Sequence, residues 1–203
     1  CSDKTGTLTM NQMTARAVVC QGRRLVVSGE GYAAAGAIAA PDGQALPALP
    51  ALERLLHVAA LANDSRVHDG QLIGDPTEGA LLALAAKGGV AAESLAQQRP
   101  RIAEIPFDSA YKFQATFHHD GQTVRVCVKG APDVLLARAG RHLGGADEAP
   151  MDEPGRAHWA AENEHLAGQA MRVLALAGKE IAARDFDPAG DLMAHMADLT
   201  LYG

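Results

Sequence analysis

Residues 111–130, "YKFQATFHHDGQTVRVCVKG", decide the fold class of this chain. Asp120-Gly121 is a dipeptide typical of hairpin turns, and it separates two runs that read as β-strands. The stretch therefore predicts two antiparallel β-strands that lie side by side in a sheet. His118 and His119 lie beside the expected turn, where we expect solvated side chains rather than metal ligands.

Working outward from this hairpin, the chain mixes strands and helices. A second hairpin is expected around Gln21-Gly22, and residues 30–50 read as a surface excursion rich in Gly and Pro. Further strands are expected within 101–108, 171–181 and 198–203, and helices within 52–63, 74–89, 131–140 and 155–170. Hairpin connections favour an α+β domain with a largely antiparallel sheet.

The helix expected in "GDPTEGALLALAAKGG" (74–89) has the clearest end signals. Asp75 suits the N-cap, Pro76 suits the first helical position, and Glu78 follows three residues after the cap, as in a capping box. Gly88 and Gly89 end the helix.

Composition sets limits on the class of protein. The 203 residues are 48% hydrophobic and carry a formal charge of −6, which predicts a folded soluble chain and argues against a nucleic-acid-binding surface. Cys1, Cys20 and Cys127 are widely spaced, fit neither a disulfide framework nor a zinc site, and favour a reducing, cytosolic location. No apolar run approaches the roughly 18 residues of a membrane helix.

Residues 1–11, "CSDKTGTLTMN", have the composition of a reaction centre. A carboxylate such as Asp3 can act as a covalent nucleophile that forms an aspartyl phosphate. Lys4 supplies a fixed cation, Thr5 a hydroxyl, and Gly6 lets the backbone approach a phosphate closely. The structural alternative is a polar turn without chemistry.

These eleven residues resemble the phosphorylation sequence of P-type ATPases, the ion pumps. "GDPTEGALL", "FDSAYKF", "VKGAPDVLL" and "MRVLALA" are similar, in the same order, to signatures of the family's nucleotide-binding domain, and "ANDS" is typical of its calcium-pump-like branch. The resemblance implies a twisted antiparallel sheet flanked by helices. It also implies a stub of the phosphorylation domain at 1–13, the nucleotide-binding domain at 14–196, and a return strand at 197–203.

The resemblance further implies roles for individual residues. Asp3 would accept the γ-phosphate of ATP with Lys4 beside it, and Asp3 and Thr5 would hold Mg²⁺ in the complete enzyme. The positions matched to nucleotide binding are Glu78 and Phe107 at adenine, Lys129 at the base end, and Lys112 and Arg172 near the phosphates, with Asp75 and Thr77 as companions. Gly130, next to Lys129, is expected to matter through its missing side chain, which allows close approach of a ligand. The alternatives are a helix cap for Glu78, a core position for Phe107 and solvated surface for the three cations.

The implied partners are ATP or ADP and the remaining phosphorylation, actuator and membrane domains of a cation pump, at the cytoplasmic face of a membrane. The chain alone is expected to bind nucleotide weakly and not to turn over. Two other interpretations stay open. One is a fragment of a haloacid-dehalogenase-type phosphatase, which Thr5 disfavours because such enzymes usually carry a second aspartate there. The other is a docking module without catalysis.

Overall fold

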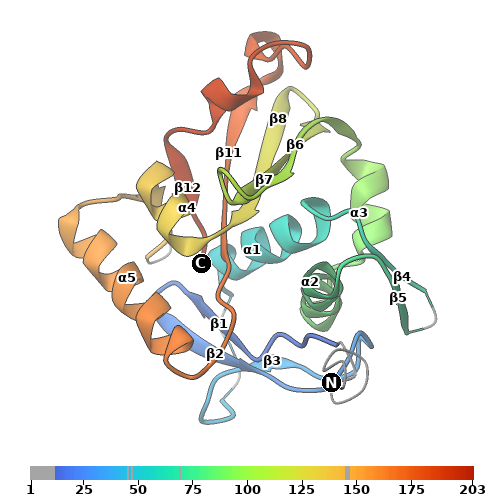
Figure 1. The fold of residues 1–203 in the computed structure, drawn as a ribbon, viewed down its shortest axis with the longest axis vertical. Coiled ribbons are helices and arrows are strands. Elements are labelled where there is room, and N and C mark those ends of the chain that lie inside the picture. The colour runs from blue at the N-terminus through green and yellow to red at the C-terminus, as the bar shows by residue number, and fades with distance from the viewer. Residues whose placement is uncertain (1–11, 45, 47, 69, 145–146) are drawn as a thin grey trace, which may run out of the picture.

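Figure 1 shows the fold in a computed structural model, which describes residues 12–44, 46, 48–68, 70–144 and 147–203. Asp3, Lys4 and Thr5, the expected phosphorylation and Mg²⁺ site, lie outside the described residues.

A seven-stranded sheet forms the centre of the molecule, with the strand order β10-β9-β12-β11-β8-β7-β6. Every neighbouring pair is antiparallel except β9 and β12, which confirms the predicted α+β class and largely antiparallel sheet. In chain order the strands are β6 (Arg101–Asp108), β7 (Phe113–Asp120), β8 (Thr123–Gly130), β9 (Ala139–His142), β10 (Ala149–Pro150), β11 (Ala175–Ala182) and β12 (Leu199–Leu201).

The β7–β8 hairpin matches the sequence prediction except for the position of its turn. Asp120 pairs with Thr123, so Gly121 and Gln122 form the two-residue loop. Gly121 has a φ of 65°, a left-handed conformation that glycine adopts without a Cβ clash. The division of the chain at residues 13 and 196 stays a prediction; β12 is an internal strand of this sheet.

Two smaller sheets complete the strands. The predicted hairpin at Gln21-Gly22 is present, and it joins β1 to β2 in a three-stranded sheet. The third strand of that sheet comes from residues 30–50, and Tyr32 in the same segment is buried. The prediction that residues 30–50 form a surface excursion is therefore wrong in part. The strands are β1 (Ala17–Cys20), β2 (Arg23–Val27) and β3 (Ile38–Ala39), with β4 (Arg66–His68) and β5 (Gln71–Ile73) as a separate hairpin.

Helices cover both faces of the central sheet. On one face, α1 packs with Cys127 and Leu176 of the sheet. On the other face, Leu135 of α4 packs with Val126 and Val128, which flank Cys127 in β8. Figure 1 shows α2 and α3 beside α1, and α5 on the other side of the molecule. The helices are α1 (Pro50–Leu61), α2 (Pro76–Lys87), α3 (Ala92–Gln98), α4 (Pro132–Arg138), α5 (Glu153–Ala167) and the 3₁₀ turns η1 (Ala183–Asp185) and η2 (Leu192–His195).

Strand β7 is buried on both faces, and this overturns one expectation. Phe113 and Phe117 point into the core cluster that also contains Leu135 of α4, so the alternating residues Thr116 and His118 face the opposite layer. His118 is only 2% exposed and bonds the Arg99 carbonyl oxygen. The expected solvated position is therefore wrong for His118, because a second layer covers this strand.

Within the part of the chain that the structure describes, no single helix has the length and apolar character needed to cross a membrane. The bent pair formed by α2 and α3, with 88° between the helices, meets those criteria only when both are taken together.

Candidate functional site

Four neighbouring strands place the sequence-predicted residues at one end of the central sheet. Gly130, at the end of β8, is opposite both Phe113, at the start of β7, and Ala175, at the start of β11. Phe113 is also opposite Asp108, at the end of β6. Phe107, Lys112, Lys129 and Arg172 lie within three residues of these paired positions. The register alone therefore gathers side chains from four separate parts of the chain.

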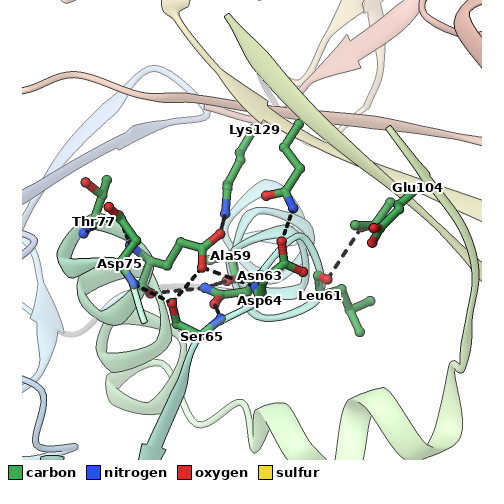
Figure 2. Close-up of polar contacts among 12 residues, drawn as sticks. Ala59, Leu61, Asn63, Asp64, Ser65, Asp75, Thr77, Glu104 and Lys129 are labelled. Carbon is green, nitrogen blue, oxygen red and sulfur yellow. Dashed lines mark hydrogen bonds and ion pairs between the residues drawn. The ribbon is translucent and has the colours of Figure 1, made fainter. Parts of the chain in front are cut away.

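The start of α2 adds a carboxylate to this end of the sheet. Lys129 Nζ lies 2.6 Å from Glu78 Oε1, and both side chains are mostly buried. In Figure 2, Lys129 extends from the sheet toward the segment that carries Asn63, Asp64 and Ser65. Burial lowers the pKa of the Lys129 ammonium below its ordinary value, while the hydrogen bond and charge of Glu78 oppose that shift.

The second oxygen of Glu78 is held by the segment that follows α1. Ser65 Oγ donates to Glu78 Oε2 at 2.6 Å, and the Asp64 backbone N–H donates to the same oxygen at 3.2 Å. Asn63 supports this segment, because its side-chain amide donates to the carbonyl oxygens of Ala59 and Glu78. Both carboxylate oxygens of Glu78 therefore have donors within the protein.

These contacts modify the capping box expected for α2. Asp75 is the N-cap, and its side chain accepts from the backbone N–H groups of Thr77 and Glu78, as predicted. In a capping box, the Glu78 side chain would accept a hydrogen bond from the Asp75 backbone N–H. Here Ser65 Oγ accepts that bond instead, at 2.9 Å. The Glu78 side chain is thereby directed toward Lys129.

Arg172 and Lys112 approach the same end of the sheet from its loops. Arg172 Nη1 lies 3.2 Å from Thr77 Oγ1, beside the N-terminus of α2, and its side chain is exposed. Lys112 is exposed as well, with a φ of 55° that an L-residue rarely adopts. Its carbonyl oxygen accepts from the Ala131 N–H, which fixes the corner next to Gly130.

The missing side chain of Gly130 allows close approach of the protein's own chain, whereas the sequence suggested close approach of a ligand. A Cβ at this position would stand 2.6 Å from both the Lys112 carbonyl oxygen and Phe113 Cβ. Such distances are too short for non-bonded atoms, so the close approach of β8 to the Lys112 corner requires glycine here.

Phe107 differs from most aromatic residues in having an exposed ring. The residue is 64% exposed, although it sits at the end of a strand in the central sheet. An exposed aromatic face at the same end of the sheet as the cations and the carboxylate is suited to stacking against a flat ring. The structural alternative of a core position does not hold for Phe107.

Three further polar residues join this cluster without having been predicted. Asp64 Oδ2 accepts from Gln114 Nε2 at 2.6 Å, and Asp64 Oδ1 accepts from Arg101 at 2.6 Å. Arg101 also donates to the carbonyl oxygens of Leu61 and Asn63, where α1 ends. The alternation of "FQATFHH" (113–119) could have indicated Gln114, since it places a polar amide on a strand with apolar neighbours.

Two hollows flank the cluster. One, of about 420 Å³, has Thr77 and Arg172 among its lining residues; the other, of about 650 Å³, has Ser65 and Arg101. Neither hollow is lined by Phe107 or Lys129. Among the described residues, no group of three or more His, Cys, Asp and Glu could hold a metal ion.

Comparison with known proteins shows the family of the chain. Residues 51–203 match the family model "P-type ATPase, cytoplasmic domain N", so the chain belongs to that family. The fold described above agrees with this assignment.

The similar proteins are cation-transporting ATPases. The chain is 42% identical to Cation-transporting ATPase pma1 of Synechocystis sp. over 89% of its length, and 38% identical to Calcium-transporting ATPase of Bacillus subtilis over 90%. It is 34% identical, over 92% of its length, to Calcium-transporting ATPase type 2C member 1 of Bos taurus. The matches cover 21%, 21% and 20% of these relatives, so the chain spans about one fifth of their length.

Proposed function

We propose that this chain binds ATP at the end of the sheet where β6, β7, β8 and β11 meet, and that it serves a cation-transporting ATPase. The observation that carries the proposal is that the strand register brings an exposed aromatic ring, three cations and a buried carboxylate to the same end of the sheet. The family and the relatives' names support it, since an ATPase requires a nucleotide site.

Each residue has a role that its chemistry can perform. The exposed Phe107 ring would stack on adenine, a contact worth roughly 1–3 kcal/mol for a base on an aromatic side chain. Lys129 and Glu78, at the buried end, would bind the polar edge of the base. Arg172 and Lys112 are exposed and would contact the phosphates, where a guanidinium can bond two oxygens at once.

In the complete pump, ATP would supply the γ-phosphoryl group and Asp3 would accept it as an aspartyl phosphate. Asp3 and Thr5 would hold Mg²⁺, with Lys4 as a neighbouring cation. Phe107, Glu78 and Lys129 would bind the base. The exposed Arg172 and Lys112 would leave the phosphate chain at the surface, where another domain can reach it. We place the site on the cytoplasmic side of a membrane, with phosphorylation, actuator and membrane domains as partners.

We expect the 203-residue chain to bind nucleotide without turnover, with a dissociation constant of about 0.1–10 mM, which corresponds to roughly −3 to −5 kcal/mol. The test is a titration of the 203-residue chain with ATP, ADP, AMP and GTP, with and without Mg²⁺, followed by backbone amide NMR. Shifts should cluster at Glu78, Phe107, Lys129 and Arg172, and Asp3→Ala should leave them unchanged.

A folded chain whose amide shifts stay constant with every nucleotide would rule out this function. The docking module would then be the better interpretation.

A further inference from the structure

The cavity of about 420 Å³ lies where the two hydrophobic core clusters of the molecule meet. Val18, Leu55 and Leu81 line it from one cluster, and Trp159 and Leu201 line it from the other. Protein interiors are packed as densely as organic crystals, and voids larger than a water molecule are few. The volume instead falls in the range of small-molecule binding sites, about 300–1,000 Å³.

The packing of α5 accounts for this space. Both α5 and β1 line the cavity, and α5 lies beside the β1–β2 sheet (Figure 1). Among the 15 residues of the helix only Trp159 is buried. The main polar link is the guanidinium of Arg24 in β2, which bonds both carboxylate oxygens of Glu162 at 2.7 and 2.9 Å. Because the helix is held by this ion pair and buries one side chain, it does not fill the space in front of β1.

The inner part of the cavity is apolar throughout. Every buried residue of its lining has an apolar side chain, apart from the indole N–H of Trp159. That N–H donates to His142 Nδ1 at 3.2 Å, so it is not available to a ligand. An apolar cavity excludes water and favours an apolar occupant.

The mouth of the cavity has the opposite character, because Arg172 is exposed there. No ion pair within the described part of the chain involves Arg172, whereas Arg16, the other cation of the lining, lies 3.7 Å from Glu30. Glu162 is the one carboxylate among the described lining residues, and the hydrogen bond from Arg24 lowers its pKa below the ordinary value. An anionic group at the mouth would therefore meet an unpaired cation and a carboxylate that is already neutralised.

We propose that this cavity binds a medium-chain aliphatic carboxylate, with the hydrocarbon chain among the buried apolar residues and the carboxylate on the Arg172 guanidinium. A guanidinium binds a carboxylate through two parallel hydrogen bonds. Decanoate has twelve non-hydrogen atoms, and at about 30 Å³ each, the share of a water molecule in the liquid, it takes up about 360 Å³. A molecule of this size fits the cavity.

Arg172 is also a proposed contact of the ATP phosphates, so a carboxylate bound there would compete with ATP for this side chain. That consequence rests on the proposed function. The carboxylate site itself does not, because it is defined by the cavity and its mouth.

Trp159 allows a direct test, because it lines the cavity and is the only tryptophan of the chain. Its fluorescence is followed while the 203-residue chain is titrated, without nucleotide, with octanoate or decanoate below the concentration at which micelles form. Burial of one CH₂ group tightens binding about fourfold, so decanoate should bind about tenfold more tightly than octanoate. Decyltrimethylammonium, with the same chain and a positive head group, should bind at least about tenfold more weakly than decanoate.

Two variants separate the head group from the chain. Arg172→Met should weaken decanoate binding by about tenfold or more and remove the difference between the two head groups. Arg184→Met is its control, because Arg184 is exposed and lies outside the cavity lining. Ala80→Leu should weaken decanoate binding by about tenfold or more without lowering the melting temperature, since the larger side chain takes up part of the cavity. Ala86→Leu, at an exposed position of the same helix outside this cavity, should leave the affinity unchanged.

An unchanged decanoate affinity in folded Ala80→Leu would overturn the inference, because the ligand would then lie outside the cavity. Should Ala80→Leu not fold, Arg172→Met decides: equal decanoate affinity in this variant and the wild-type chain would overturn the inference. Trp159 fluorescence that stays constant with both carboxylates would do the same. None of these results bears on the proposed ATP site, which the nucleotide titration tests separately.

Discussion

Lys129 Nζ and Glu78 Oε1 are 2.6 Å apart, and only 11% and 14% of the two side chains are exposed. The pair joins β8 to the start of α2, two elements about fifty residues apart in the chain. A buried ion pair contributes little net stability over an apolar pair, but leaving one member alone is costly.

The two members of this pair should therefore show strong energetic coupling. We expect Glu78→Gln and Lys129→Met each to lower the free energy of unfolding by about 2–3 kcal/mol, since each leaves its partner buried without a matching charge. The double variant should lose less than the sum of the two by at least about 1 kcal/mol. Urea denaturation at neutral pH measures all three.

The exposed pair Arg184–Asp185 is the control for that cycle, with 3.7 Å between its charged groups. Arg184→Met and Asp185→Asn should each change stability by less than about 0.5 kcal/mol. Additive losses at Glu78 and Lys129 would mean that the two charges do not depend on each other.

Phe107 should separate binding from stability. Because its ring is exposed, Phe107→Ala should change the free energy of unfolding by less than about 0.5 kcal/mol. The same variant should weaken ATP binding by about 5- to 100-fold, the range expected for loss of stacking on a base. Nucleotide titration and urea denaturation of one preparation give both numbers.

Ile73 provides a matched control, because it is 69% exposed and lies at the end of β5, outside the proposed site. Ile73→Ala should alter neither quantity. An unchanged ATP affinity in Phe107→Ala would exclude Phe107 as the stacking residue.

His118 should make stability depend on pH in the acidic range. Burial lowers its pKa from about 6.5 to about 4, although the hydrogen bond to the Arg99 carbonyl acts in the opposite direction. Since a carbonyl only accepts, Nδ1 carries the proton, and Nε2 lies 2.9 Å from the Thr116 hydroxyl. A second proton would place a positive charge on this buried ring, close to Arg99, Arg101 and Arg125.

Between pH 6.5 and pH 4 the unfolded chain therefore binds more protons at this residue than the folded chain. Stability should fall as the pH drops through this window, by about 3 kcal/mol in total from His118 alone. His118→Gln should flatten this dependence, measured by denaturation at several pH values. His119→Gln, at the exposed neighbouring residue, should keep it; equal slopes in the two variants would contradict the assignment.

Gly130 should tolerate no side chain. The Cβ of Gly130→Ala would meet the Lys112 carbonyl oxygen and Phe113 Cβ, both at 2.6 Å, and we expect a loss of about 2–3 kcal/mol in the free energy of unfolding. Gly168→Ala is the comparison, because Gly168 has a helical φ of −61° and its nearest atom would be 3.2 Å away. Thermal denaturation should show a much smaller change there.

The sequence was sufficient to predict the helices and strands whose start and end signals lie within the segment itself. The hairpin of β7 and β8 has a turn signal of its own, and α2 has a cap, a proline and two terminal glycines, so both were predicted, apart from a one-residue shift of the hairpin turn. Strands β4 and β5 have three residues each, too few to show a period of two, and α3 begins without a side-chain cap. These elements were missed.

The site was predictable as a set of residues but not as a set of contacts. The resemblance to a family indicated Glu78 and Lys129, yet their ion pair depends on how α2 packs against the sheet. Asp64 and Gln114 are separated by 50 positions and share no local pattern, so only the folded chain shows that they meet. The burial of His118 likewise depends on a layer contributed by distant parts of the chain.

The position of β12 has a consequence for synthesis on the ribosome. Leu199–Leu201 lies between β9 and β11 in the central sheet, although every other strand of that sheet precedes it in the chain. Before residue 201 has left the ribosome, β9 and β10 are already made. Without β12, however, they have no strand that joins them to β11 and the rest of the sheet. Because domains acquire their contacts as they leave the ribosome, this sheet is completed only when its last strand arrives, and until then the edge of β11 is open to a chaperone or to a wrong partner.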